Sequence, residues 1–152
     1  MRNKQKGFSL IELLIVVAII LIIAAIAIPN LLRSKIAANQ ASAVASLRTL
    51  NTSSVLFDTN YQQYPSKIAD MATGATVTST SADLIDSVLA LGTKSGYNFS
   101  WSGGGTTGPT YAIWADPVSS SSGTVHYYTD QSLVIRSNAT TTATVNDLAI
   151  GN

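Results

Sequence analysis

Apolar and polar positions divide the first third of the chain into a basic leader, an apolar run and an amphipathic run. Between Phe8 and Leu32 the only charged residue is Glu12. A helix rises about 1.5 Å per residue, so this run is long enough to cross a hydrocarbon core of about 30 Å. We therefore expect a membrane-spanning helix over residues 8–32.

Beyond Pro29 the pattern stays helical but becomes amphipathic. Apolar positions recur at spacings of three and four, which indicates one buried helical face. We expect a single helix from about Phe8 to about Phe57, kinked near Pro29 because proline lacks a backbone donor and crowds the preceding turn. The stripe consists of Leu32, Ile36, Ala43, Leu47, Leu50 and Phe57, with Gln40 and Ser54 in its two gaps. The opposite face carries Arg33, Lys35, Asn39, Arg48 and Asn51.

Turn-forming residues follow the helix. Residues 58–64 predict a turn, and the Tyr64-Pro65 pair favours extended backbone. Residues 68–71 are expected to form one helical turn. A capping-box pattern at Thr80 and Asp83 predicts a short helix over residues 84–89, ended by Gly92.

After Gly92 the period of the pattern changes to two, which is typical of strands. Strands are expected over residues 97–101, 110–115, 124–129 and 133–136, joined by turns short enough for an antiparallel meander. The apolar face of this sheet would cover the helix stripe. The predicted fold is α+β: a long kinked N-terminal α-helix, half membrane-spanning and half amphipathic, packed on a small antiparallel β-sheet headgroup. Its parts are a leader (1–7), the helix (8–57) and the headgroup (58–152).

Glu12 is costly in a membrane-spanning run. A charged carboxylate at hydrocarbon depth costs several kcal/mol, so such an acid indicates a function and a partner. Cutting the chain between Gly7 and Phe8 would create an α-amino group one helical turn from Glu12. The amine of a neighbouring copy could equally face Glu12 across a pair of helices.

The segment Gly7-Phe8-Ser9-Leu10-Ile11-Glu12, after the basic leader 1–6, resembles the cleavage and methylation signal of type IV prepilins and pseudopilins. The resemblance implies that a membrane-embedded peptidase cuts after Gly7 and methylates the Phe8 amine. It also implies a homopolymeric filament in which Glu12 neutralises the terminus of another subunit. Pro29 is interpreted either as a kink where the helix leaves the membrane or as a bend specific to the filament. Many relatives carry a glycine in the apolar helix, whereas this chain has none between Gly7 and Gly74.

More general resemblance to pilin headgroups extends to Tyr64-Pro65, residues 96–99 and residues 127–136. Many pilins close a C-terminal loop with a disulfide, but this chain contains no cysteine. Packing and hydrogen bonds must therefore hold that loop. The lack of cysteine also excludes thiolate catalysis and cysteine-based metal sites.

Charge and length limit the other possibilities. The 152 residues suffice for one compact domain and an anchor. Removing Arg2, Lys4 and Lys6 with the leader leaves six basic side chains against eight acidic ones, which argues against nucleic-acid binding as the main role. The positive-inside rule places the leader in the cytoplasm and the headgroup outside. Cleavage at Ala25-Ile26-Ala27, as in a secretory signal, is the alternative.

No catalytic or cofactor-binding set can be assembled from the remaining residues, and no enzyme is predicted. His126 is expected to be a half-exposed strand residue, because no nucleophile and acid accompany it. The aspartates lack calcium-loop spacing, so no metal is predicted. The alternative is a site to which Asp116 and Asp130 contribute through folding, as in some major pseudopilins. The sheet aromatics are interpreted as packing groups, with base stacking as the alternative.

The leading hypothesis is a structural subunit of a type IV pilus, stored in the inner membrane and then assembled for adhesion or twitching motility. Its implied partners are further copies, the prepilin peptidase and methyltransferase, the assembly platform and the assembly motors. A type II secretion pseudopilin is the main alternative. A minor pilin that binds DNA or surfaces is another, and a membrane-anchored enzyme is the third.

Overall fold

The computed structural model describes residues 8–74, 76–105 and 108–151, and the chain forms two compact units, Met1–Lys35 and Ile36–Asn152. The long helix α1 spans Leu10–Tyr61, in agreement with the predicted single helix. It continues past Phe57 because the rings of Phe57 and Tyr61, one turn apart, pack with centroids 4.7 Å apart. The residue that ends it is Gln62, whose φ of 57° lies in the left-handed region.

The predicted stripe of α1 is buried from Ala43 to Phe57, but one residue assigned to the outer face is buried as well. Asn51 is only 5% exposed. Its side chain donates to Thr129 Oγ1 at 2.9 Å and accepts a hydrogen bond from the Tyr111 hydroxyl at 3.2 Å. Asn51 follows Leu50 directly and lies one turn after Leu47, so it borders the stripe. The sheet supplies polar partners that a helical pattern does not reveal.

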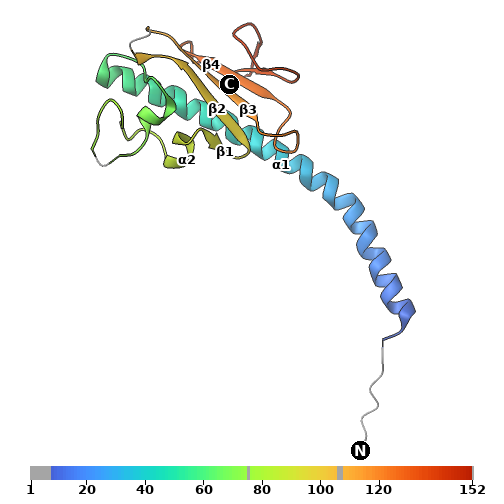
Figure 1. Cartoon of the computed structure of the whole chain (residues 1–152). Coiled ribbons are helices and arrows are strands. Elements are labelled where there is room, and N and C mark those ends of the chain that lie inside the picture. The colour runs from blue at the N-terminus through green and yellow to red at the C-terminus, as the bar shows by residue number, and fades with distance from the viewer. Residues whose placement is uncertain (1–7, 75, 106–107, 152) are drawn as a thin grey trace, which may run out of the picture. The chain divides into compact units, whose positions relative to one another are not determined.

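Six strands form one antiparallel sheet in which every strand pairs with its neighbour in sequence. Figure 1 shows β2, β3 and β4 side by side along α1 of the headgroup unit. The predicted meander on the helix stripe is therefore confirmed. The strands are β1 (Thr93–Lys94), β2 (Tyr97–Gly103), β3 (Tyr111–Pro117), β4 (His126–Asp130), β5 (Arg136–Asn138) and β6 (Leu148–Ala149).

The predicted bounds of the fourth strand, residues 133–136, are wrong. Leu133 has a φ of 63°, and its N–H donates to the Asp130 carbonyl, so the chain is still turning there. The strand begins at Arg136 instead. Two further strands, β1 and β6, are only two residues long, too short for a period-two pattern to indicate them.

Between α1 and the sheet, one short helix agrees with prediction and the other differs. The 3₁₀ helix η1 spans Ile68–Met71 as expected, whereas α2 is confined to Ser87–Ala90. The predicted cap at Thr80 and Asp83 is wrong, because the backbone N–H groups of residues 82–85 donate to carbonyls of residues 70–72. The helix cap is Asp86, which accepts a hydrogen bond from Leu89 N.

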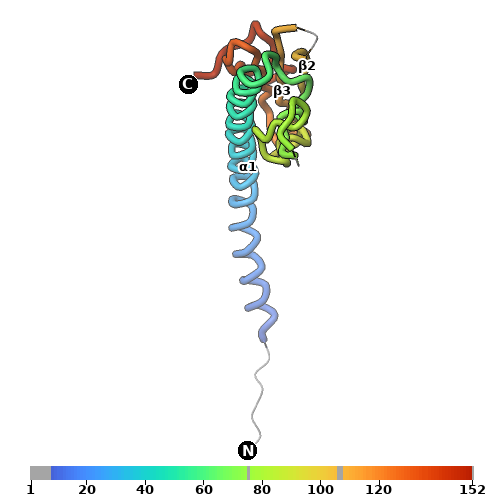
Figure 2. The backbone as a smooth tube through the Cα atoms, turned by 90° about the vertical axis from the view of Figure 1, so that its left-hand side faces the viewer, coloured from blue at the N-terminus to red at the C-terminus, as the bar shows by residue number. Residues whose placement is uncertain are grey.

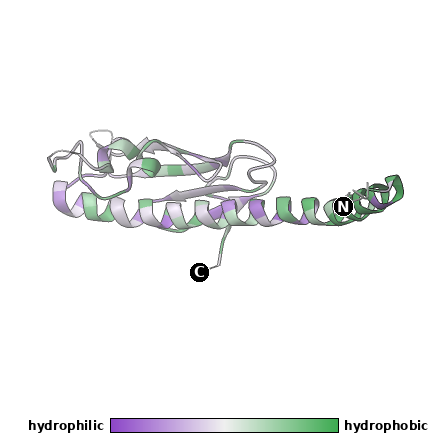
Figure 3. Ribbon diagram, turned by 90° about the horizontal axis from the view of Figure 1, so that it is seen from below, coloured by the Kyte–Doolittle hydropathy of each residue, from purple (hydrophilic) through white to green (hydrophobic). Residues whose placement is uncertain are grey.

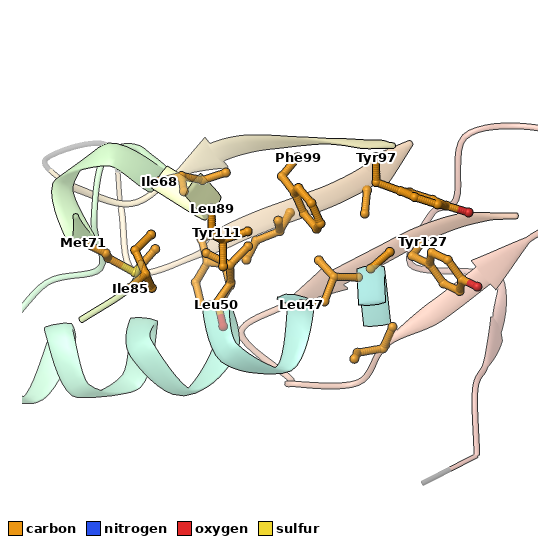
Figure 4. Packing of buried hydrophobic residues seen from close by; sticks show 14 of the residues in the cluster. Leu47, Leu50, Ile68, Met71, Ile85, Leu89, Tyr97, Phe99, Tyr111 and Tyr127 are labelled. Carbon is orange, nitrogen blue, oxygen red and sulfur yellow. The ribbon is translucent and has the colours of Figure 1, made fainter. Parts of the chain in front are cut away.

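The core lies between α1, the inner face of the sheet and the segment that carries η1 and α2. Figure 2 shows this last segment beside α1. Figure 4 shows how the contributions meet: Leu47 and Leu50 come from α1, while Met71 and Leu89 come from the η1–α2 segment. The sheet contributes Tyr97, Phe99, Tyr111 and Tyr127. These side chains are nearly or wholly buried, so the headgroup has its own hydrophobic core.

Two connections of the sheet depend on local chemistry. Gly104 has a φ of 73°, and a Cβ there would lie 2.0 Å from the Pro65 carbonyl oxygen, so only glycine fits. The C-terminal loop of residues 138–147 is closed at its base by Asn138 Nδ2, which donates to Asp147 Oδ1 at 2.8 Å. Arg136 Nη1 also donates to the Asp147 carbonyl at 2.9 Å. Hydrogen bonds thus hold this loop, as expected for a chain without cysteine.

Candidate functional site

The N-terminal part of α1 carries a long apolar surface that its own unit does not bury. None of the most apolar stretch of the helix is buried, and its length and composition suffice to cross a membrane. Figure 3 shows this part of α1 as almost continuously hydrophobic. Leu10, Leu14 and Ile22 each expose more than half of their surface. Burying such side chains gains about 1.5–3 kcal/mol each, so lipid or other chains must cover this surface.

The first turn of α1 brings Ser9 and Glu12 together. Ser9 precedes the first helical residue, Leu10, and its backbone N–H donates to Glu12 Oε2 at 2.8 Å. This bond is one half of a capping box, in which an acid at the third helical position satisfies the backbone N–H of the cap. The carboxylate also lies at the positive end of the helix dipole. Sequence reasoning noted the acid at the helix start but missed the cap, although the Ser-x-x-Glu spacing signals it.

The other predicted site residues are placed as follows. Gly7 lies outside the described residues, whereas Phe8 lies two residues before the first helical residue and is 83% exposed. Pro29 lies inside α1, roughly 25 Å along the helix from Glu12. The structure therefore groups Phe8, Ser9 and Glu12 at one helix end and leaves Pro29 apart. The kink predicted at Pro29 stays a prediction.

His126 lies in β4 and pairs with Asp116 of β3, as its Nδ1 is 2.5 Å from Asp116 Oδ1. The two side chains are 25% and 33% exposed. The predicted half-exposed strand position is therefore confirmed, although the aspartate partner was missed. The register of β3 and β4 causes this pairing, because it brings together residues ten apart in sequence.

The alternative that Asp116 and Asp130 share a calcium ion is wrong. Asp130 is opposite Ala112 on β3, so Asp116 and Asp130 lie at opposite ends of the strand pair, with backbone positions about 13 Å apart along β3. Asp130 instead accepts hydrogen bonds from Ser132 N and Oγ and from the Tyr128 hydroxyl. Within residues 8–74, 76–105 and 108–151, no three acidic or histidine side chains gather as a metal site.

The aromatic side chains act as packing groups, as predicted. Trp101 stacks on Tyr111 with centroids 4.8 Å apart and planes within 7°, and Tyr64 packs edge-on against the same ring. Burial raises the pKa of Tyr111 and raises that of Tyr97 to about 12. The Tyr97 hydroxyl donates to the Val125 carbonyl at 2.8 Å. All of these aromatic side chains therefore make their contacts inside the headgroup.

Comparisons with known proteins include the segment around the helix start. The model of the prokaryotic N-terminal methylation motif matches residues 2–28. The type IV wide pilus major component PilA4 of Thermus thermophilus is 37% identical over 106 residues, which cover 70% of this chain and 79% of that protein. The chain belongs to the family of type IV pilins and type II secretion pseudopilins.

Other members of this family match a shorter part of the chain. The type IV major pilin protein PilA of Myxococcus xanthus is 44% identical over 61 residues, but the match covers 40% of this chain and 28% of that pilin. The type II secretion system core protein G of Escherichia coli is 32% identical over 63 residues, covering 41% of this chain and 43% of that pseudopilin. The pilin and pseudopilin families are structural rather than enzymatic.

Proposed function

We propose that this chain is the structural subunit of a type IV pilus, assembled through the N-terminal part of α1. The observation that carries the proposal is the uncovered apolar surface of that helix. In the membrane, lipid covers it, and in a filament the same surface packs against other copies. The similarity to PilA4 over most of both chains favours a pilus subunit.

Processing precedes assembly in this proposal. A prepilin peptidase cuts between Gly7 and Phe8, and the new amine of Phe8 is methylated. The match to the methylation motif covers both residues. The exposed position of Phe8, outside the regular helix, leaves its backbone accessible to an enzyme. The leader with Arg2, Lys4 and Lys6 stays in the cytoplasm, and the headgroup lies on the other side of the inner membrane.

Assembly then exchanges the partner of Glu12. In the single chain its carboxylate accepts the Ser9 N–H. In the filament we assign to Glu12 the Phe8 amine of a neighbouring copy, which neutralises two charges in a low-dielectric environment. The pairing also fixes the axial stagger between copies. Pro29 provides the bend that fits the helix to the filament core.

The proposed partners are further copies of the chain, the peptidase and methyltransferase, and the platform and motor that extract the subunit from the membrane. Adhesion and twitching motility are the proposed uses of the filament. The similarity to core protein G favours a second candidate, a pseudopilin of type II secretion. That role places the polymer in the periplasm.

Electron microscopy of surface filaments released by shear, with mass spectrometry of their subunit, tests the proposal. The pilus role predicts filaments composed of this chain, beginning at a methylated Phe8. A chain found only in the cell envelope, together with loss of protein secretion on its deletion, would instead support the pseudopilin role. Filaments that persist after deletion of the chain would contradict a role as their main subunit.

A further inference from the structure

A polar cleft of about 390 Å³ lies at the C-terminal end of α1. Asp58, Gln62, Gln63 and Tyr64 line it from the helix end and the turn that follows. Gly105 and Gly108 line it from the connection between β2 and β3, which reaches the helix end through a hydrogen bond from Gly105 N to the Tyr64 carbonyl at 2.7 Å. Figure 1 shows this end of α1 and β2 together. The volume is within the range of small-ligand sites.

The polar side chains of this cleft have unused hydrogen-bonding capacity. Across the described residues, the side chains of Asp58, Gln62 and Gln63 make no hydrogen bond. Asp58 belongs to the last turn of α1 and Gln62 directly follows the helix, and both line the cleft. The headgroup aspartates that do have partners are Asp70, Asp86, Asp116, Asp130 and Asp147. Asp83 shares the unpaired state of Asp58, but it does not line the cleft.

The electrostatic environment of Asp58 indicates the sign of the missing partner. Asp58 belongs to the last turn of α1, where exposed carbonyl groups give a negative partial charge that normally attracts cations. That turn contains no basic residue, and no lysine or arginine lines the cleft within the described part of the chain. The carboxylate and the helix end therefore create a negative potential that no basic side chain of the described lining compensates. This potential disfavours anions such as phosphates and favours a cationic ligand.

We propose that this cleft binds a primary ammonium group. An ammonium group has three N–H donors and no acceptor, which matches one carboxylate and two amide carbonyl oxygens. Asp58 supplies the charge, while Gln62 and Gln63 accept the remaining donors. A divalent cation such as calcium fits less well, because it takes six or more oxygen ligands and the cleft offers a single carboxylate. The ammonium group comes either from a second copy of the chain or from an amino sugar in the surroundings.

Binding is tested with the full chain, isotope-labelled and held in detergent micelles, by following its backbone amide signals in NMR spectra. Glucosamine is the probe, and N-acetylglucosamine is the control that lacks the charge. Glucosamine should give saturable shifts at Gln62, Gln63 and Gly105. The control should bind at least about tenfold more weakly, because a hydrogen bond to a charged group contributes more than a neutral one.

Matched variants locate the binding charge. Asp58→Asn preserves the shape of the side chain and removes its charge, so it should weaken glucosamine binding at least about tenfold. Asp83→Asn removes an equally unpaired headgroup charge outside the cleft and should leave binding unchanged. Unaltered binding by the Asp58→Asn chain would overturn the proposal.

The source of the ammonium group is distinguished by zero-length coupling of carboxylates to amines in a mixture of labelled and unlabelled chains. A link from Asp58 to an amine of the other isotopic form, found by mass spectrometry, would assign the ligand to a second copy. Saturable glucosamine binding without such a link would assign it to a free amino sugar. Absence of both results would refute the proposal, and neither measurement requires filament formation.

Discussion

At the scale of single residues, the two polar side chains that matter most on α1 have opposite surroundings. Glu12 lies in an apolar stretch and accepts one hydrogen bond from its own chain. Asn51 is buried in the headgroup and connects α1 to Thr129 and Tyr111. The first is proposed to change partners during assembly, whereas the second fixes the position of the helix on the sheet.

Replacing Glu12 separates helix capping from charge pairing. Glu12→Ala should yield a processed protein that accumulates in the membrane with few filaments, because each added subunit buries a Phe8 amine without its counter-charge, at a cost of about 3–5 kcal/mol. Glu12→Gln preserves an acceptor for Ser9 N–H but should fail in the same way. Immunoblots of membrane and sheared fractions measure both effects. Abundant filaments built only from either variant would falsify the pairing.

Asn51→Ala should destabilise the headgroup by about 1–3 kcal/mol, because it leaves buried partners on Thr129 and Tyr111 unsatisfied. The matched control is Thr52→Ala on the exposed side of the same turn, expected within about 0.5 kcal/mol of the wild type. Denaturant unfolding followed by circular dichroism measures the difference. Equal stabilities of the two variants would argue against a network at Asn51.

At the scale of elements, sequence patterns predict the helices and strands whose apolar positions follow a regular pattern over a long stretch. The apolar run and the amphipathic stripe identify α1, and alternation identifies β2, because each pattern extends over several turns or residues. Elements whose bounds depend on hydrogen bonds to segments remote in the sequence were missed or misplaced. Ile85 is not helical, since its backbone binds the Met71 carbonyl, and β5 begins at Arg136, since Leu133 still belongs to a turn.

The connection after β2 is a test at this scale. Gly104→Ala should strongly destabilise the headgroup, by roughly 1–3 kcal/mol from the backbone alone, because φ is 73° and the added Cβ would also meet the Pro65 carbonyl. Gly151→Ala is the control, since an added Cβ there meets nothing within 4 Å. Thermal unfolding compares the two. A stable Gly104→Ala chain would mean that the connection rearranges freely.

The C-terminal loop should make stability depend on pH in the acidic range. Hydrogen bonds from the Thr144 backbone N–H and from Asn138 lower the pKa of Asp147 below its ordinary value. Its ionised form is favoured by folding, so this contribution is present above an ordinary pKa of about 3.9 and disappears as pH falls through the lower folded value. Asp147→Asn should flatten that part of the stability profile. Urea unfolding between pH 2 and about pH 6 measures it.

At the scale of the whole molecule, the chain combines an apolar segment that needs a cover with a headgroup that has its own core. The membrane helix could be predicted from the length of the apolar run, and the α+β class and the meander could be predicted from periodicity. The candidate site could be derived only in part: Glu12 was evident from its cost in lipid, whereas the bond from Ser9 and the cleft at Asp58 arise from spatial proximity. The Asp116–His126 pair likewise follows from strand register.

A chain without residues 1–28 should therefore be soluble and unfold cooperatively. Removing the apolar segment leaves the core around Leu47, Leu50 and Phe57 intact. Thermal melting followed by near-ultraviolet circular dichroism should show one sigmoidal transition. Aggregation without a transition would mean that the headgroup depends on the removed segment.

Closure of the C-terminal loop by hydrogen bonds rather than by a covalent link affects how the headgroup responds to mechanical load. Pulling on the chain beyond Asn138 can extract residues 138–147 by breaking the hydrogen bonds to Asp147 and exposing the buried Ala143, without breaking a covalent bond. A short loop closes again within about a microsecond and needs no oxidant to do so. We therefore expect the loop of this headgroup to unfold and refold reversibly under tension, whereas a disulfide would transmit the force to the sheet.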